Sequence, residues 1–139
     1  MAYSGYLIKI GGSNGVDLPM KYIKAESYKS TPDQRMEVKA TRDTTGVLHR
    51  NTVVHKASKI EFETPPITNS DVSALNTIFS NAYTDALQRK LTIQFYDEET
   101  DSYREADCYM PDVQYTIYRI DNVKNIIYYN PIRFAFIEY

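Results

Sequence analysis

The sequence predicts an α+β, mainly β fold: an antiparallel β-sandwich or barrel with one flanking amphipathic helix and a protruding hairpin arm. Several short segments alternate apolar and polar residues, which is the period of a half-buried strand. A single stretch has the three- and four-residue spacing of a helix, and it lies between two groups of strands. Because helices do not alternate with strands, the sheet should be antiparallel. The 139 residues fit one domain, residues 1–139, since two separate cores would each be marginally small.

The first strand is expected at residues 6–10, and the glycine-rich segment 11–15 stops it. A second strand is expected at about 20–28, after Pro19. Residues 35–41 alternate strictly between apolar and polar, so this strand should have one wet face. Its apolar residues would share the other face: Met36, Val38 and Ala40.

A hairpin arm is predicted at about 42–58. It begins with the turn signal Asp43-Thr44-Thr45-Gly46 and continues through the polar, weakly periodic segment 47–58, before the alternating strand 59–64. A connection of roughly twelve polar residues is longer than the ~2–5 residues of a typical hairpin loop. The arm also carries apolar residues that a lone hairpin has no core to bury: Val47, Leu48, Val53 and Val54. This favours contact with a partner.

The predicted helix spans about 70–88. Thr68, Asn69 or Ser70 can serve as its N-cap, and Asp71 in the first turn suits the positive end of the helix dipole. Its apolar residues recur at helical spacing along one face: Val72, Leu75, Ile78, Phe79, Ala82, Tyr83 and Ala86. The helix is therefore expected to lie on a core.

Strands return after the helix. Residues 91–96 and 103–108 are predicted to pair as a hairpin around an acidic turn. Two further strands are expected at 113–120 and 125–139, broken by Asp121-Asn122 and by Pro131. In residues 103–108 the single cysteine, Cys108, shares the apolar phase of its strand, so a buried and inert thiol is expected.

Composition excludes several classes of protein. The 16 Lys and Arg residues against 18 Asp and Glu residues give a formal charge of -2, so the surface as a whole is not built for nucleic acid and no sequence-specific nucleic-acid partner is expected. No stretch approaches the ~20 apolar residues that span a bilayer, and the N-terminal residues do not form a signal peptide, so no membrane partner is expected. Tyrosine is abundant, with 13 Tyr and no Trp, which suits both strands and interfaces.

The sequence offers no pair of residues that suggests catalysis. His49 and His55 both lie in a polar segment and neither accompanies a recognisable nucleophile motif. The glycine-rich segment 11–15 lacks the pattern of a phosphate loop, and the acidic run 97–107 lacks the EF-hand pattern. We therefore expect no enzyme activity, no cofactor and no metal; a solvated hairpin tip is the expected role of the acidic run.

The charge distribution along the chain points instead to association. Residues 34–59 carry six Lys or Arg and two acids, whereas residues 97–107 carry six acids and one Arg. Opposite potentials on one small chain suit head-to-tail contact between copies, although ordinary variation in surface charge produces similar contrasts. The predicted contact residues lie in these two segments: Arg42, Asp43, Val47, Leu48, His49, Arg50, Val53, Val54, Asp97, Glu98, Glu99 and Asp101.

In layout, the chain resembles the small proteins encoded in the tail modules of tailed bacteriophages and of prophages of Gram-positive gut bacteria. The segments that carry the resemblance are YLIKIGG at 6–12, the basic arm TRDTTGVLHRN at 41–51 and KIEFETPP at 59–66, followed by one helix and terminal hairpins. The plan is similar to the ring-forming fold shared by tail-tube proteins, distal tail proteins and baseplate hub domains. The length fits a tube-type or single-domain adaptor better than a two-domain distal tail protein.

The resemblance implies a role and a location. It implies a subunit of a hexameric ring around the tail lumen, through which DNA passes, with the sheets joined between subunits and the arm contacting the next ring. Arg42, Asp43, His49 and Arg50 would be contact residues, and the partners would be copies of the chain and neighbouring tail proteins. The protein would be made in the host bacterial cytoplasm and reside in the virion.

A second class of function stays open from the sequence. A tyrosine-rich β-barrel can act as a binding module for a small ligand or for single-stranded nucleic acid, because aromatic rings beside basic residues stack on bases. The candidate residues for such a site are Tyr22, Lys24, Tyr28 and Lys29.

Overall fold

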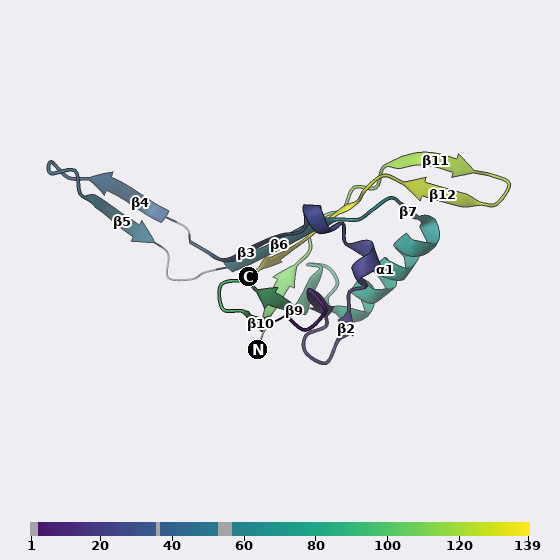
Figure 1. Ribbon diagram of the computed structural model, residues 1–139, viewed down its shortest axis with the longest axis horizontal. Coiled ribbons are helices and arrows are strands. Elements are labelled where there is room, and N and C mark those ends of the chain that lie inside the picture. Colours follow the sequence, from purple (N-terminus) through teal and green to yellow (C-terminus); the bar gives the residue numbers. More distant parts are fainter. Residues whose placement is uncertain (1–2, 36, 53–56) are drawn as a thin grey trace.

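The computed structural model describes residues 3–35, 37–52 and 57–139 and has an α+β, mainly β architecture (Figure 1). Met36 and the segment 53–56, which includes Val53, Val54 and His55, lie outside the described residues. The strands are β1 (Ile8–Ile10), β2 (Val16–Asp17), β3 (Lys29–Gln34), β4 (Glu37–Arg42), β5 (Leu48–Thr52), β6 (Ala57–Glu63), β7 (Ile67–Thr68), β8 (Tyr83–Asp85), β9 (Lys90–Asp97), β10 (Ser102–Tyr109), β11 (Ile117–Asp121), β12 (Ile126–Tyr129) and β13 (Arg133–Glu138). The helical elements are the 3-10 turns η1 (Met20–Tyr22) and η2 (Ala25–Ser27) and the helix α1 (Asn69–Ala82).

Every strand pairing among the described residues is antiparallel, which confirms the predicted sheet type. The body sheet runs in the order β2-β1-β9-β10-β13-β6-β3, with β8 also paired to β9. A second sheet has the order β11-β12-β7, and β4 and β5 form a separate two-stranded hairpin. The two hairpins β4–β5 and β11–β12 project from opposite ends of the body (Figure 1).

The core lies between α1 and the body sheet. Leu75 and Phe79 on the helix are fully covered, and the Phe79 ring lies 5.3 Å from that of Phe134 and 6.0 Å from that of Phe136 on β13. Burying a side chain of this size contributes about 1.5–3 kcal/mol, so these rings account for much of the attachment of the helix.

The alternating segments form strands as predicted. In β9 the side chains of Leu91, Ile93 and Phe95 are buried and those between them are not, and β9 pairs with β10 as the predicted hairpin. Cys108 on β10 is buried, which confirms that prediction. The glycine-rich segment 11–15 forms the turn between β1 and β2, and a Cβ at Gly15 would lie 2.0 Å from the carbonyl oxygen of Ile10.

The strand predicted at about 20–28 is wrong, because η1 and η2 occupy this segment. Pro19 precedes η1, and its carbonyl accepts the amide of Tyr22 at 3.0 Å. The hydroxyl of Ser27 donates to the carbonyl of Lys24 at 2.6 Å and closes the second turn. Tyr22 and Ile23 are both buried, which an alternating strand would not allow.

The predicted helix end is also wrong. The helix begins after Thr68, whose amide donates to Asp71 Oδ2 at 3.2 Å in a capping box, as the capping signal predicted. It ends at Ala82 and not near 88, because Tyr83 adopts an extended conformation and pairs with Leu91. The tertiary pairing of β8 with β9 overrides the helical pattern of the last predicted turn.

Two further boundaries differ. The strand predicted at 35–41 is split: β3 ends at Gln34 in the body sheet, and β4 belongs to the projecting hairpin, where Ala40 is exposed. Ala40 therefore does not share a buried face as predicted. The strand predicted at 113–120 begins only at Ile117.

Candidate interaction surfaces

The first surface is the projecting hairpin β4–β5, residues 37–52, called the arm below. The hairpin projects from the body (Figure 1). Thr41 pairs with His49 and Arg42 with Leu48, and every residue from 39 to 52 is exposed. The predicted arm at about 42–58 therefore begins earlier than expected, because its first strand is β4. A two-stranded hairpin without a covering layer is marginally stable in water, so this arrangement favours a partner.

The tip of the arm is organised by the carboxylate of Asp43. Its Oδ1 accepts hydrogen bonds from the Thr45 hydroxyl at 2.6 Å, the Thr45 amide at 2.9 Å and the Val47 amide at 3.1 Å. Nε2 of His49 lies 3.0 Å from Oδ2. These contacts favour the ionised form, so the Thr45 hydroxyl first and His49 second hold the pKa of Asp43 well below its usual range. Asp43 and His49, two predicted contact residues, thus set the shape of the tip.

Other predicted contact residues of the arm point their side chains into solvent. Val47 and Leu48 are 55% and 43% exposed, so two consecutive aliphatic side chains lie at the surface of the arm. Arg42 donates to the carbonyl of Gly46 at 2.9 Å, and Arg50 forms an ion pair with Glu37. The structure therefore brings the arm residues together on one hairpin.

The root of the arm is tied to the body by Arg104 on β10. Nη2 of Arg104 lies 3.2 Å from Asp33 Oδ1 and donates to the buried Ser58 hydroxyl at 3.0 Å. Asp33 on β3 and Ser58 on β6 flank the last paired rung before the arm, Gln34 opposite Ala57. Arg104 therefore fixes the place where both strands leave the sheet.

The acidic turn between β9 and β10 lies next to this root. Glu98, Glu99 and Asp101 are exposed, as a solvated tip requires. Asp97 is only 1% exposed, so its predicted place in the solvated tip is wrong. Its Oδ2 lies 2.7 Å from Nε of Arg104, and this ion pair compensates for the burial of the carboxylate.

The second surface, the β11–β12 hairpin, was absent from the predicted contact residues. Ile117 and Ile120 on β11 are 47% and 58% exposed, and Val123 at the tip is 93% exposed. The Tyr118 ring contacts that of Tyr128 at 5.9 Å between centroids. Apolar residues in both phases of a strand are typical of a strand that is covered on both faces. The sequence pattern therefore gives no signal that this hairpin projects from the body.

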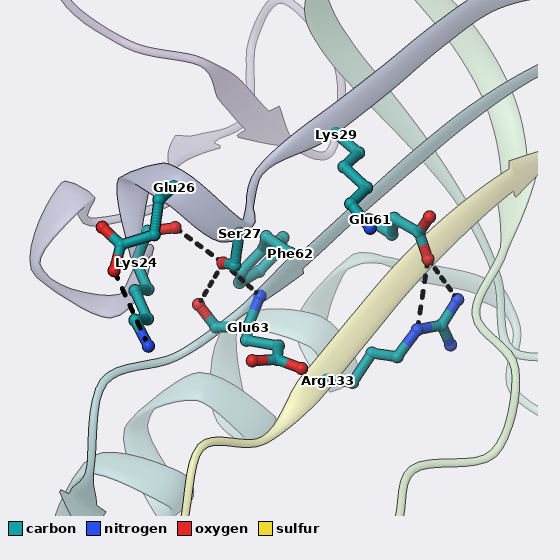
Figure 2. Close-up of a pocket in the computed structure, with 8 residues that line it drawn as sticks. All are labelled: Lys24, Glu26, Ser27, Lys29, Glu61, Phe62, Glu63 and Arg133. Carbon is teal, nitrogen blue, oxygen red and sulfur yellow. Dashed lines mark hydrogen bonds and ion pairs between the residues drawn. The ribbon is translucent and has the colours of Figure 1, made fainter.

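A shallow pocket on the body lies beside η2, β6 and β13 (Figure 2). Its lining residues are Lys24, Glu26, Ser27, Lys29, Glu61, Phe62, Glu63 and Arg133. Arg133 contacts Glu61 Oε2 at 2.5 Å through Nη2, and this hydrogen bond lowers the pKa of the Glu61 carboxyl. Lys24 lies 3.7 Å from Glu26. Four of the charged lining residues thus form two ion pairs, Lys24 with Glu26 and Arg133 with Glu61.

Of the two tyrosines proposed as stacking platforms, Tyr22 is buried and Tyr28 is partly buried. Tyr22 is 5% exposed, and its hydroxyl lies 3.2 Å from Asp71 Oδ1. Tyr28 packs against the core, and burial raises the pKa of its hydroxyl well above the ordinary value. The burial of Tyr22 disfavours its use as a stacking platform, whereas Tyr28 keeps part of its side chain exposed.

Neither a metal-binding cluster nor a membrane-spanning helix occurs in the part of the chain that the structure describes. Residues 3–35, 37–52 and 57–139 contain no group of three or more His, Cys, Asp and Glu placed to hold a metal ion. No helix within these ranges has the length and apolar character needed to cross a membrane.

Comparisons with known proteins give one match. The chain matches a protein family described as "Family of unknown function (DUF6711)", and the match covers residues 1–139. No curated protein and no solved structure matches at a significant level.

Proposed function

The chain belongs to the family described as "Family of unknown function (DUF6711)", and we propose that it is a structural subunit of a bacteriophage or prophage tail, without catalytic activity, that assembles with copies of itself into a ring. The proposal places it in the virion, as a tube-type or distal adaptor subunit around the tail lumen. Its partners are further copies and the neighbouring tail proteins.

The arm is the observation that carries this proposal. All its described residues from 39 to 52 are exposed, and it displays Val47 and Leu48 to solvent. A free hairpin of this kind gains little from its own side chains, whereas docking on another subunit buries them. The resemblance to ring-forming tail proteins supports another copy of the chain as that subunit.

Charge supports contact between copies. The arm carries Lys39, Arg42 and Arg50, and the turn between β9 and β10 displays Glu98 and Glu99. Opposite charges steer docking and fix its register, and this effect weakens with salt. The proposed contact therefore sets the basic arm of one subunit on the acidic turn of another.

The test is the mass of the full chain by light scattering across a concentration series. We expect the mass to rise from the 16.1 kDa of one chain to that of a ring, six-membered by resemblance. In the matched variant an Asn-Gly turn replaces residues 35–56, because Gln34 and Ala57 are directly paired and two residues suffice to join them. This arm-replaced variant should keep its circular dichroism spectrum and fail to assemble into the ring.

Point variants test whether the exposed apolar side chains of the arm make the contact, because they leave the arm in place. Val47→Asp and Leu48→Asp should weaken assembly without altering the fold, since both side chains face solvent. A full chain that remains monomeric throughout the series, alone and mixed with neighbouring tail proteins, would contradict the proposal. Assembly that is equally strong without the arm would contradict the assigned surface.

A further inference from the structure

The β11–β12 hairpin carries an open sheet edge. In the sheet order β11-β12-β7, strand β11 has β12 on one side and no neighbour on the other among the described residues. It lies at the end of the molecule opposite the arm (Figure 1). An exposed edge strand with apolar side chains is a template for pairing with another chain.

The side chains at this edge are too apolar for a free surface strand. Ile117, Ile120 and Val123 are 47%, 58% and 93% exposed. The register shift in β11 falls between Ile117 and Arg119, so the segment from Arg119 to Asp121 is regular and paired with β12. Residues 119–121 are thus available to pair with another strand, and the exposed Ile117 and Val123 lie on either side of them.

The charges of this segment select the partner. Arg119 and Asp121 flank Ile120 and, being two residues apart, lie on the same face of the strand. If the strand pairs antiparallel with its own copy about Ile120, each Arg119 lies opposite an Asp121. Pairing about Arg119 would oppose two arginines, and pairing about Asp121 would oppose two aspartates, and like charges directly opposite are destabilising.

We propose that β11 docks antiparallel on β11 of a second copy of this chain, around a two-fold axis through Ile120 that sets each Arg119 opposite Asp121 of the other copy. The occupant is a second copy because the sequence Arg-Ile-Asp is complementary in charge to itself when reversed. The two Ile120 side chains meet at the axis, and Ile117 of each copy approaches the exposed Val123 of the other.

The neighbouring contacts are compatible with this pairing. The guanidinium of Arg119 lies over the Tyr128 ring at 4.9 Å, which holds the side chain on that face. Asp121 uses Oδ1 to accept the amides of Val123 and Lys124, and this turn keeps its carboxylate in place. Both charged groups are therefore positioned before the second copy arrives.

This contact goes beyond the ring proposed above. A ring needs a heterologous contact between two different surfaces, whereas the β11 contact is isologous and joins copies in pairs. The two contacts use opposite ends of the molecule. Each can be lost without the other.

The experiment is a charge-swap cycle measured by sedimentation equilibrium on the full chain. Arg119→Asp and Asp121→Arg each oppose like charges at both positions, so each should weaken the two-fold dimer at least about tenfold. The double variant restores opposite charges and should dimerise within about threefold of the original chain. A mixture of the two single variants should form heterodimers, because every opposed pair is then complementary.

A matched control is Lys21→Asp, which reverses the charge of an exposed side chain on η1 and should leave the dimer unchanged. Single variants that dimerise like the original chain, a mixture that does not restore association, or an original chain without a two-fold dimer would each overturn the proposal. Loss of ring assembly in the arm-replaced variant bears on the ring alone, because β11 is intact there.

Discussion

Oδ2 of Asp97 lies 2.7 Å from Nε of Arg104, and this buried ion pair links the two strands of the β9–β10 hairpin at the root of the arm. The carboxylate is 1% exposed. Arg104 also reaches Asp33 and the hydroxyl of Ser58. One guanidinium thus neutralises a buried acid and fixes both strands that lead into the arm.

Replacing Arg104 by Met should therefore lower the free energy of unfolding. Removing one partner of a buried ion pair leaves the other charge buried and uncompensated. We expect a loss of about 2–3 kcal/mol, below the ~3–5 kcal/mol of a fully buried pair, since 33% of the Arg104 side chain is exposed. Urea unfolding followed by circular dichroism measures it.

Two further variants sharpen this measurement. Asp97→Asn with Arg104→Met removes both charges and keeps an acceptor for the Glu99 amide, so most of the stability should return. Arg133→Met, at a half-exposed ion pair with Glu61, should cost less than about 1 kcal/mol. Equal losses of unfolding free energy in Arg104→Met and Arg133→Met would contradict a special role for Arg104.

The turn at the arm tip should resist acid. The pKa of Asp43 is lowered by the hydrogen bonds from Thr45 and His49, so its contribution is complete above the ordinary value of 3.8 and disappears as the pH falls through the folded-state value. The test uses the His49→Gln variant, so that the Asp43 carboxylate is followed without the neighbouring imidazole. Its Thr45 and Val47 amide signals should hold their NMR shifts from neutral pH down to about 3.8 and move below it. Adding Asp43→Asn should abolish this transition. A transition midpoint at or above pH 3.8, the ordinary pKa of an Asp carboxyl, would refute the prediction.

Tyr96 should ionise late. Its hydroxyl donates to Asp101 Oδ1 at 2.6 Å, and this hydrogen bond raises the pKa of Tyr96 to about 12. A raised pKa stabilises the fold below the ordinary value of 10.0, and that contribution is lost as the pH rises through about 12. The ultraviolet titration of the chain minus that of Tyr96→Phe gives the value directly. Asp101→Asn should move it towards 10.0, and an unchanged midpoint would sink the assignment.

The thiol of Cys108 should be nearly inert in the folded protein. Burial raises its pKa to about 12, and the thiolate is the species that attacks a disulfide reagent. In denaturant the thiol should react at once. If reaction requires unfolding, Arg104→Met should speed it by roughly 30- to 150-fold, the factor that corresponds to its loss of stability. Rapid reaction of the native chain would show an accessible thiol.

The strand pattern of the body follows from local sequence, whereas its exceptions depend on distant contacts. Alternation located β6, β9 and β10, and Asp71 marked the start of α1. The end of α1 was missed because Tyr83 pairs with Leu91 on β9. The spacing of apolar residues along a helix gives no information about such a tertiary pairing. The burial of Asp97 was missed for the same reason, since the register of the hairpin brings Arg104 to it.

The candidate surfaces were predictable in part. The turn signal at Asp43 and the apolar residues Val47 and Leu48, which have no core of their own, located the arm. Its first strand was misassigned because alternation in residues 37–42 indicates a strand without indicating a layer to cover it. The β11 edge was missed because Ile117, Tyr118 and Ile120 fit a buried strand equally well, and only the structure places that strand beyond the body.

The opposed hairpins have a hydrodynamic consequence. An elongated particle drags more solvent than a compact one of equal mass, so this chain should migrate on a sizing column ahead of globular standards of 16.1 kDa. A column calibrated with such standards would therefore assign a single chain the apparent mass of a larger species. The arm-replaced variant should elute later by more than its lost residues account for, which makes elution volume a direct gauge of how far the arm extends.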